Sequence, residues 1–518
     1  MMTGPATRLS GLDEDARAAR FARLQERLVP VWHAMRRDEA GESIVVVPSV
    51  ASSGPGALVQ LLEERFLFLL FLLRQPRLQV IFVTGRPVPE AVVEYYLGLL
   101  PGVIPRQARR RLHMVAAHDG SSRPLAEKLL ERPRTLARLG ELIPDRARCH
   151  LVPYATTTLE RDLALALGIP LYGADPRLLA FGTKSGGRRV FAASGVRMPR
   201  GTEGVRSTDD VVAALARIRA EAPDAGHAIV KLEDEAAGRG NAVVDLRGLP
   251  SPGAEDERGA LLERLQALEP EHPELDPRAF LDRLAKDGGV VEERVRGGEV
   301  RSPSVQLRVT PLGEVELLST HDQLLGGRGG QTYVGCRFPA DPAYAGAITA
   351  EAAKVGAALA AEGVLGRFAV DFVVTRDGAG PWTPYAIELN LRKGGTTHPF
   401  LTLQFLTDGR YDAERGVFVA PSGRAKHLVG TDQLESELLR GLNLDDLFDA
   451  IVRHRLHFDQ ARQAGVVFHM MSALGELGRI GLTSVADSAE EADALYRRAG
   501  DVVLQEAAPA PELDLPPV

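Results

Sequence analysis

The chain has 518 residues, of which 45% are hydrophobic and 25% charged, an ordinary composition for a globular protein of two or three domains. The 62 basic and 69 acidic residues give a formal net charge of −7. No basic block stands out beyond Arg106–Leu112, which reads best as a solvated helix face, so the charge gives no indication of a nucleic-acid partner.

The cysteines and the N-terminus bear on the compartment. Cys149 and Cys336 are the only two cysteines and follow no metal-ligand spacing, which predicts two buried free thiols in a reducing cytoplasm. The first residues lack the charged-then-apolar order of a signal peptide. The apolar run Phe66–Leu73 is far too short to span a bilayer, so we expect a buried helix there and no membrane association.

The first part of the chain alternates strand and helix signals. Ser43–Ser49 and Leu78–Gly85 read as buried parallel strands, and Ala57–Gln75 and Pro89–Leu100 read as the helices that follow them. This order predicts a doubly wound, Rossmann-like α/β unit. The loop Ser52–Gly56 between strand and helix could bind an anion, but a plain turn is the better interpretation.

The middle of the chain changes pattern near Gly168. Its apolar runs follow one another in hairpin-like order and are separated by Gly-rich loops, which predicts an α+β catalytic body. Pro250–Gly259 reads as an exposed insertion, and Pro421–Gly500 as a small α+β unit. The predicted division is a helical extension at 1–40, a Rossmann-like domain at 41–167, the catalytic domain at 168–420, a C-terminal domain at 421–500 and a Pro-rich tail at 501–518.

The stretch Ala386–Phe400, AIELNLRKGGTTHPF, carries the clearest chemistry. Glu388, Asn390 and Arg392 occupy alternate positions and therefore share one face of a strand. If the hairpin turns near Ala379–Gly380, Asp371 lies directly opposite Glu388, about 5 Å away. Two carboxylates and an amide oxygen suit Mg²⁺. A solvent-facing polar hairpin would explain the acids, but not their apolar surroundings, so we favour a metal site.

Basic residues upstream could hold phosphate. Lys184 opens a helix that carries Arg188 and Arg189, and Lys231 ends the buried strand AIVKL, where a lysine needs an anion. The loop that follows contains Gly238 and Gly240, whose backbone amides could approach phosphate oxygens.

A second strand and turn, GGVVEERVRGGEV, resembles a nucleotide-binding hinge. Backbone groups near Glu293 and Val295 would read adenine, and Glu299 would hold the ribose. An edge strand with solvated acids explains the same pattern equally well.

Taken in order, these parts resemble the ATP-grasp superfamily, and more closely the pheganomycin-type peptide ligases. The matching stretches cover nearly the whole chain and include EERFLFLLFLLRQP, GVLGRFAVDFVV, AIELNLRKGGTTHPF and GVVFHMMSALGELGRIGLTSV. The resemblance implies a Rossmann-like pre-ATP-grasp domain, an ATP-grasp domain and a family-specific C-terminal α+β domain.

The resemblance also implies residue roles. Lys184 and Lys231 would bind the nucleotide phosphates together with the loop at Gly238 and Gly240, while Glu293, Val295 and Glu299 would bind the nucleoside. Asp371, Glu388 and Asn390 would hold two Mg²⁺ ions, with Mn²⁺ as a substitute. Arg392 would bind the reacting carboxylate or the transferred phosphoryl group. The loop departs from the family pattern, because Ala237 stands where serine is expected and Arg239 where glutamate is expected.

The implied reaction is ATP-dependent amide formation. A carboxylate attacks the γ-phosphoryl group of ATP, and an amine then displaces phosphate from the acyl phosphate. The partners would be a small carboxylic acid and an amino acid or peptide amine, in peptide natural-product biosynthesis in the cytoplasm. A homo-oligomer is compatible with this reaction. Two alternatives stay open: modification of a ribosomal precursor peptide by an ester or amide crosslink, and a catalytically weak ATP-binding regulator.

Three histidines lie in the family-like stretches. His398 follows the metal strand closely and could contact substrate or take the proton of the amine; a structural role is equally consistent. His321 is a further substrate candidate, whereas His469 reads better as structural. The Gly-rich segment Leu324–Gly335 could be a lid or substrate loop, or a plain hairpin turn.

Overall fold

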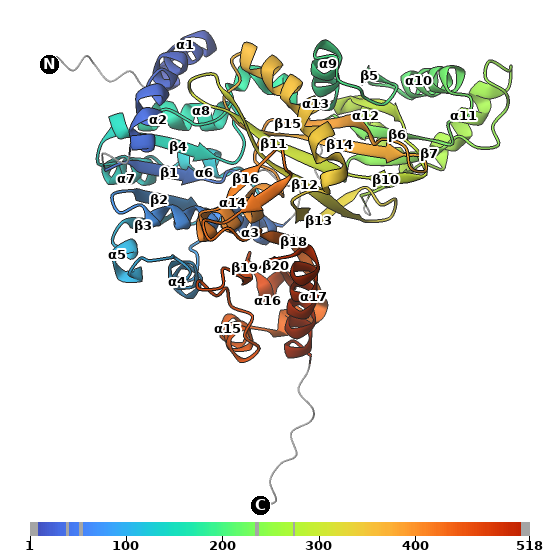
Figure 1. The fold of residues 1–518 in the computed structure, drawn as a ribbon. Coiled ribbons are helices and arrows are strands. Elements are labelled where there is room, and N and C mark those ends of the chain that lie inside the picture. Colours follow the sequence, from blue (N-terminus) through green and yellow to red (C-terminus); the bar gives the residue numbers. More distant parts are fainter. Residues whose placement is uncertain (1–8, 38–40, 51–54, 234–237, 273–274, 509–518) are drawn as a thin grey trace, which may run out of the picture.

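The structure is a computed structural model that describes residues 9–37, 41–50, 55–233, 238–272 and 275–508 (Figure 1). The loop at Ser52–Gly56, interpreted above as a turn, lies mostly outside these residues. Three large sheets make up the molecule, and the active-site candidates lie between them.

The first sheet is parallel, as the alternating pattern predicts. Its strands lie in the order β3-β2-β1-β4, with β1 next to β2 and β4 in parallel register. The strands are β1 (Ser43–Val47), β2 (Gln79–Thr84), β3 (Leu112–Ala116) and β4 (Cys149–Pro153). The helices of this part are α1 (Glu14–Gln25), α2 (Leu28–Arg37), α3 (Gly56–Glu64), α4 (Glu90–Gly98), α5 (Pro105–Arg109), α6 (Leu125–Leu130), α7 (Pro133–Leu142) and α8 (Thr158–Leu167).

The apolar run after α3 differs from the prediction in its geometry. The expected helix Ala57–Gln75 is α-helical only as far as Glu64, and Arg65–Arg74 forms a 3-10 helix. Its apolar residues are almost all buried, as expected for this run. Because the run has no polar face, hydrophobic periodicity could not distinguish three residues per turn from 3.6.

The second sheet is antiparallel, in the order β5-β9-β6-β7-β8. Its strands are β5 (Gly201–Val205), β6 (His227–Leu232), β7 (Asn241–Asp245), β8 (Glu269–Pro270) and β9 (Gly289–Glu293). The helices α9 (Lys184–Ala193), α10 (Thr208–Glu221), α11 (Glu257–Gln266) and α12 (Pro277–Asp287) accompany it. The insertion at Pro250–Gly259 is largely exposed, as predicted, but its Glu257 is buried in an ion pair with Arg219.

The third sheet has nine strands in the order β10-β14-β11-β12-β13-β18-β20-β19, with β15 on the other edge of β14. Its strands are β10 (Glu299–Arg301), β11 (Pro303–Val309), β12 (Val315–Gly326), β13 (Thr332–Phe338), β14 (Gly366–Arg376), β15 (Thr383–Asn390), β18 (His427–Glu435), β19 (Gly465–His469) and β20 (Arg479–Ala486). Helices α13 (Pro342–Ala361) and α17 (Ala489–Glu506) pack on it, as Figure 1 shows.

The C-terminal strands continue this third sheet instead of forming one of their own. Strand β18 pairs with β13, with Cys336 opposite Gly430. The remaining elements near this junction are α14 (Thr397–Thr407), β16 (Arg410–Asp412), β17 (Val417–Val419), α15 (Leu444–Arg453) and α16 (Leu474–Leu477). The predicted boundary near residue 420 therefore falls inside one continuous sheet, and the domain limits stay predictions.

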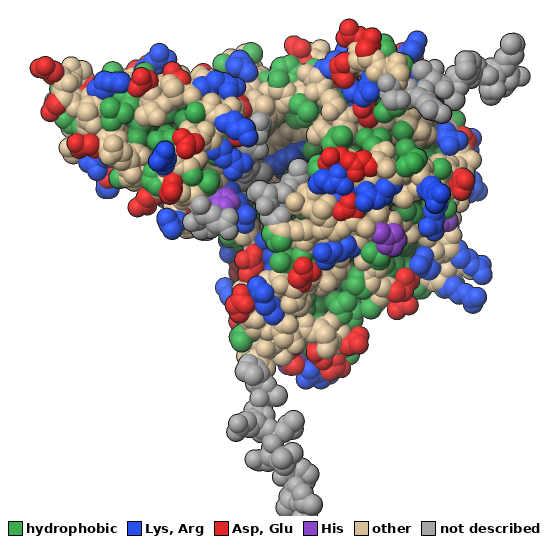
Figure 2. All heavy atoms as spheres, turned by 180° about the vertical axis from the view of Figure 1, so that it is seen from behind, with side chains coloured by type: hydrophobic (Ala, Val, Ile, Leu, Met, Phe, Trp, Pro, Cys, Tyr) green, Lys and Arg blue, Asp and Glu red, His purple; other side chains and the backbone are tan. Residues whose placement is uncertain are grey.

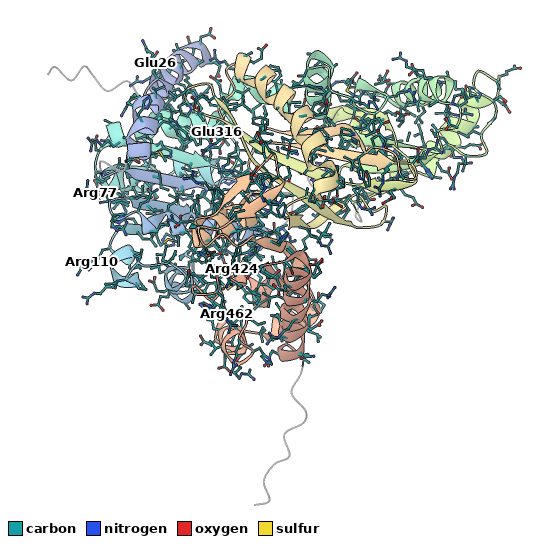
Figure 3. The ribbon with its side chains drawn as sticks, in the orientation of Figure 1. Glu26, Arg77, Arg110, Glu316, Arg424 and Arg462 are labelled. Atoms are coloured by element: carbon teal, nitrogen blue, oxygen red, sulfur yellow. The ribbon has the colours of Figure 1, made fainter. Side chains whose placement is uncertain are left out.

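The basic block, the two cysteines and the absence of a predicted membrane span can also be compared with the structure. Arg106 and Arg110 of the basic block are exposed, and Arg110, labelled in Figure 3, lies at the outer edge of the molecule. Cys149 and Cys336 are free and buried, as predicted. Within the residues described, none of the helices has the length and apolar character needed to cross a bilayer.

Candidate active site

A cavity of about 1190 Å³ lies where the three sheets meet. Its walls include Tyr154 after β4, Lys231 on β6, and Asp371 and Glu388 on β14 and β15. The face seen in Figure 2 is hollowed, and Lys and Arg side chains gather in the hollow. A large concave site lined with opposite charges is the natural place to look for chemistry.

The two predicted carboxylates face each other across β14 and β15. Asp371 is the register partner of Glu388, as the hairpin argument predicted. Leu389 and Leu391, which flank Asn390, are buried behind this face. The Asn390 amide donates a hydrogen bond to Asp371 Oδ2 at 3.1 Å, so the three oxygen-bearing side chains form one group.

The electrostatics of this pair fit a site that needs a cation. Burial raises the pKa of Asp371 to about 6, and the charge of Glu388 contributes to the increase. Burial also acts to raise the pKa of Glu388, but Lys184, together with Arg392 and Lys231, outweighs it and lowers that pKa. Close carboxylates repel each other, and a bound cation would relieve this repulsion.

Lys184 supplies a positive charge next to this pair. It is the first residue of α9, whose N-terminus is capped by the Thr183 hydroxyl accepting from the Gly186 amide at 3.0 Å. Its Nζ lies 2.7 Å from Glu388 Oε1. The structure thus brings together Lys184 and the metal-ligand candidates, although 204 residues separate Lys184 from Glu388 in the chain.

Lys231 has a partner that the sequence analysis did not identify. It is buried on β6, and its Nζ lies 2.5 Å from Glu292 Oε2. Glu292 also accepts a hydrogen bond from Arg188 Nη1 at 2.7 Å. Burial acts to raise the pKa of Glu292, but Lys231 and Arg188 outweigh it and lower the pKa. An acid inside an apolar strand was the available signal for this network.

The Gly-rich loop reaches the cavity through Gly238. This residue has φ +76°, and a Cβ there would lie 2.0 Å from the carbonyl oxygen of Gln331, so only glycine fits. Arg239 also lines the cavity, whereas Gly240 does not and instead accepts from the Leu232 amide at 2.9 Å. Ala237, the substituted position, lies outside the described residues.

The proposed adenine hinge is split by the structure. Glu293 and Val295 line the cavity, and the Glu293 carboxylate accepts from Arg200 Nη1 at 3.0 Å. Glu299 is not among the lining residues, and its carboxylate is paired with Arg376 on β14 at 2.5 Å. The placement therefore supports the hinge and not the ribose role of Glu299.

Arg392 lies on the cavity wall beyond Asn390. Its Nη1 donates to the Tyr154 hydroxyl at 2.9 Å, and its guanidinium lies 5.6 Å from the centre of that ring. Tyr154 comes from the parallel sheet, so it joins two parts of the chain at the site. The sequence carried no signal for this contact, which spans 238 residues.

Neither histidine proposed to contact substrate lines the cavity. His321 is fully buried, lies 2.9 Å from the Ser319 hydroxyl through Nε2, and has its pKa lowered to about 3 by burial. His398 is buried next to His469 and Asp432. Both are buried among their neighbours, so their placement favours the structural role, and contact with substrate stays a prediction.

The Gly-rich segment Leu324–Gly335 comprises the end of β12, the turn at residues 327–331 and the start of β13. It is a hairpin turn, and several of its residues, including Gly330 and Gln331, also form cavity wall. The two interpretations of this segment are therefore compatible.

Known proteins resemble this chain in sequence. A family model described as IQCH-like, ATP-grasp, matches residues 178–264 and 275–414, and a second, the PGM1 C-terminal domain, matches residues 446–499. L-propargylglycine--L-glutamate ligase of Streptantibioticus cattleyicolor is 32% identical over 452 residues, which cover 85% of this chain and 89% of the relative. IQ motif-containing protein H of Danio rerio is 27% identical, and the match covers 71% of this chain but only 40% of that protein.

Solved structures share the fold. An ADP complex of N5-carboxyaminoimidazole ribonucleotide synthetase has a TM-score of 0.52 at 10% identity and covers 90% of this chain and 98% of its own. A β,γ-ATP complex of the biotin carboxylase of Campylobacter jejuni has a TM-score of 0.53 at 14% identity and covers 91% of this chain and 95% of its own. At such low identity these likenesses establish the fold alone.

Proposed function

The chain belongs to the ATP-grasp family of carboxylate–amine ligases, with a pheganomycin-type ligase among its relatives, and we propose that it joins a small carboxylic acid to the amine of an amino acid or peptide. The reaction would pass through an acyl phosphate and release ADP and phosphate. The observation that carries this proposal is the opposed pair Asp371 and Glu388, with Asn390 and Arg392 on the same cavity wall.

The oxygen ligands fit magnesium. Asp371 and Glu388 offer two carboxylates and Asn390 an amide oxygen, the donor set that Mg²⁺ takes with substrate phosphates. Burial and the charge of Glu388 raise the pKa of Asp371, so a bound cation would favour its ionised form, as Lys184 does for Glu388. Bound there, two Mg²⁺ ions, or Mn²⁺ in their place, would offset the negative charge of the phosphates during transfer.

The lysines would neutralise the nucleotide. Lys184 can exchange its contact with Glu388 for a phosphate oxygen once the carboxylates have other partners. Lys231 is held at the cavity wall by Glu292, so its position is fixed before ATP arrives. A charge placed in advance needs no reorganisation when the phosphoryl group moves. The Gly238 backbone would approach the phosphates from the opposite side, and Glu293 and Val295 would contact adenine.

Arg392 would bind the acid substrate. A guanidinium offers two parallel donors that match a carboxylate, and Tyr154 holds one edge of the Arg392 group in place. The same donors would stabilise the oxyanion that forms when the amine attacks the acyl phosphate. In this account no side chain acts as a nucleophile. Glu299, engaged with Arg376, has no part in it.

The setting follows from the same class of reaction. A cytoplasmic location supplies ATP and fits the two free, buried cysteines. The amine acceptor would be an amino acid or a peptide, and the product an amide in natural-product biosynthesis. A homo-oligomer is compatible with this proposal.

The test is a coupled assay of ADP release. Purified protein is mixed with Mg²⁺, ATP and a matrix of carboxylic acids and amines, and products are identified by mass spectrometry. We expect ADP release that requires both an acid and an amine, together with a product whose mass equals their sum less one water. ADP release that never depends on the pair of substrates, over a broad panel, would sink the ligase proposal.

A further inference from the structure

His398, Asp432 and His469 form a compact buried cluster in the C-terminal half of the molecule. They come from three elements: α14, which follows the metal strand β15, and strands β18 and β19. Their exposed fractions are 4%, 5% and 3%. The ligase chemistry described above uses none of the three side chains.

The polar atoms of this cluster converge on one point. His398 Nε2 lies 3.0 Å from Asp432 Oδ1, His469 Nε2 lies 3.1 Å from the same oxygen, and the two Nε2 atoms lie 3.1 Å apart. The three atoms therefore form a nearly equilateral triangle. Every vertex angle of such a triangle is close to 60 degrees, and this geometry decides between two explanations.

A network of hydrogen bonds alone does not satisfy this triangle. If both imidazoles donate from Nε2 to Asp432, two donors lie 3.1 Å apart and repel each other. If one imidazole donates to the other, its Nε2–H points away from the carboxylate, because a hydrogen bond weakens steeply when bent. In either arrangement one pair of these buried polar atoms makes an unfavourable contact, and such a contact is costly away from water.

A transition-metal ion would bind all three atoms at once, so that none of the three pairs would be left with an unfavourable contact. Three atoms separated by 3.0–3.1 Å can all lie about 2 Å from one ion above their plane, the usual length of Zn–N and Zn–O bonds. Each atom could then offer a lone pair to the ion. We propose that His398, Asp432 and His469 form a binding site for a divalent transition-metal ion of the zinc class, separate from the magnesium site.

The identity of the ligands sets the class of ion. Two imidazoles and one carboxylate suit zinc, cobalt, iron or nickel, whereas Mg²⁺ prefers oxygen ligands throughout. Three protein ligands leave a fourth position for water. The proposed ion is thus chemically distinct from the one that Asp371 and Glu388 would bind, and an excess of Mg²⁺ should not displace it.

Two arginines hold the carboxylate in place. Arg65 Nη1 lies 2.6 Å from Asp432 Oδ2, the oxygen that faces away from the histidines, and Arg479 Nε donates to the Asp432 backbone carbonyl at 2.7 Å. The positive charges of these arginines would repel a metal ion bound nearby. Arg65 nevertheless keeps Asp432 ionised and oriented, as hydrogen-bonding partners of metal-binding carboxylates do, and it leaves Oδ1 available.

The ion would connect the catalytic part of the chain to the C-terminal strands. His398 lies on α14, directly after the strand that bears Glu388 and Asn390, while Asp432 and His469 lie on strands of the C-terminal region. Asp432 also forms part of the cavity wall. A bound ion would therefore fix this wall, independently of the magnesium ions that serve ATP.

Metal binding can be measured without any assay of activity. Untagged full-length protein is stripped with a chelator and dialysed against Zn²⁺ or Co²⁺ in excess Mg²⁺, and bound metal is counted by mass spectrometry. We expect one ion per chain, with a cobalt visible spectrum typical of a site with nitrogen ligands. The variants His398→Gln and His469→Gln should lose that ion, while His321→Gln, which alters an equally buried histidine outside the cluster, should retain it.

A cysteine variant gives a positive signal, so loss of the metal through misfolding cannot be mistaken for loss of a ligand. His469→Cys keeps a metal ligand at the same place, and its cobalt form should gain a sulfur-to-metal charge-transfer band in the near ultraviolet. Folded wild-type protein that binds no more zinc or cobalt than His398→Gln would overturn the proposal. So would a His469→Cys protein that binds cobalt without the new band. Because the readout is metal content, these outcomes do not depend on whether the ligase proposal holds.

Discussion

Arg392 and Lys393 are neighbours in the chain, but their side chains line different cavities. Arg392 lies on the wall of the large cavity, whereas Lys393 lines a smaller cavity of about 130 Å³. No carboxylate lines this smaller cavity within the residues described, and Glu316, labelled in Figure 3, is paired with Arg308. Two consecutive residues therefore place one cation, proposed to bind substrate, on the large cavity and a second, buried cation on the smaller one.

The buried lysine has a measurable effect on stability. Burial lowers the pKa of Lys393 to about 7, and the nearby charge of Arg367 contributes. The ordinary value in an unfolded chain is about 10.4, so between these two values the unfolded chain binds more protons than the folded one. Stability therefore rises with pH across this window, with a slope of at most about 1.4 kcal/mol per pH unit from this group.

Lys393→Met should remove this contribution. We expect the difference in melting temperature between wild type and variant to change steadily in favour of wild type from about pH 7 to about pH 10. His150, whose pKa burial lowers to about 4, titrates below this window. Calorimetry at several pH values measures the difference. Lys354→Met, which alters an exposed lysine of α13 paired with Glu351, should show no such trend, and equal trends in both variants would contradict the assignment.

Glu388 offers the sharpest change at the active site. Glu388→Gln keeps the size of the side chain and removes its charge, so magnesium and Lys184 would both lose a partner. We expect the rate of ADP release to fall by at least about 100-fold, since metal ions supply several kcal/mol of charge stabilisation in the transition state. The melting temperature should change little, because the variant loses the Lys184 contact but also removes the repulsion between Glu388 and Asp371.

Glu299→Gln is the matched control for this prediction. Glu299 pairs with Arg376 away from the cavity, and both side chains are partly exposed, at 38% and 30%. Such pairs contribute little, so we expect activity within about threefold of wild type. Equal losses in the two variants would argue against the distinction drawn between these residues.

Among the secondary-structure elements, β9 connects two parts of the proposed nucleotide site. Its Glu292 joins Arg188 of α9 to Lys231 of β6, and all three side chains are buried. Burying three charges is costly unless each has a partner. The network therefore couples the stability of this sheet to the position of a lysine that should contact ATP.

Glu292→Gln would leave two buried cations with one neutral partner. We expect a loss of about 3–5 kcal/mol in stability, the usual cost of breaking a buried ion pair, together with weaker ATP binding. Thermal unfolding and nucleotide titration measure the two effects. Glu203→Gln removes the second and more exposed partner of Arg188, 32% accessible, and should cost much less; a loss as large as that of Glu292→Gln would contradict this account.

The sequence predicted those features that depend on local order. Alternation placed Glu388, Asn390 and Arg392 on one face, and the short hairpin fixed Asp371 opposite Glu388. The 3-10 geometry of Arg65–Arg74 was missed because an apolar run has no face to reveal its period. Tyr154, which contacts Arg392 across 238 residues, could not be predicted, because distant contacts depend on how the sheets pack.

The position of His398 likewise depends on contacts between distant parts of the chain. Local sequence placed His398 close to the metal strand, and this suggested contact with substrate. Its actual neighbours are Asp432 and His469, the latter 71 residues away, on strands whose position next to α14 no local pattern records. Sequence proximity to an active site is therefore a weaker guide than the face on which a side chain lies.

At the scale of the whole molecule, the C-terminal region is part of the central architecture. The largest hydrophobic core cluster contains Phe66 and Phe82 from the first part of the chain together with Phe400 and Phe468 from its second half. Figure 1 shows the C-terminal strands next to the central sheet and below the parallel one. Cooperative folding of these parts is the consequence, since none buries its apolar surface alone.

Truncation tests this dependence. A chain that ends at Ala425 loses β18, β19 and β20, and it exposes the edge of β13 and much of that core. We expect it to be insoluble, because exposed strand edges and apolar surface lead to aggregation. A chain that ends at Ala508 keeps these elements and should remain soluble and active. A soluble, nucleotide-binding product from the shorter chain would show that the catalytic part folds independently.

The pairing of β13 with β18 also restricts how enzymes of this kind can be recombined. Exchanging the segment after residue 420 between relatives would require the incoming strand to reproduce the register of Cys336 with Gly430 and to fit the shared core. A chimaera joined at that apparent boundary would pair two strands from different proteins, β13 and β18, in the middle of one sheet, with no guarantee that their registers match. Changes of substrate preference are therefore expected to arise by substitutions in cavity-lining loops more readily than by shuffling of whole segments.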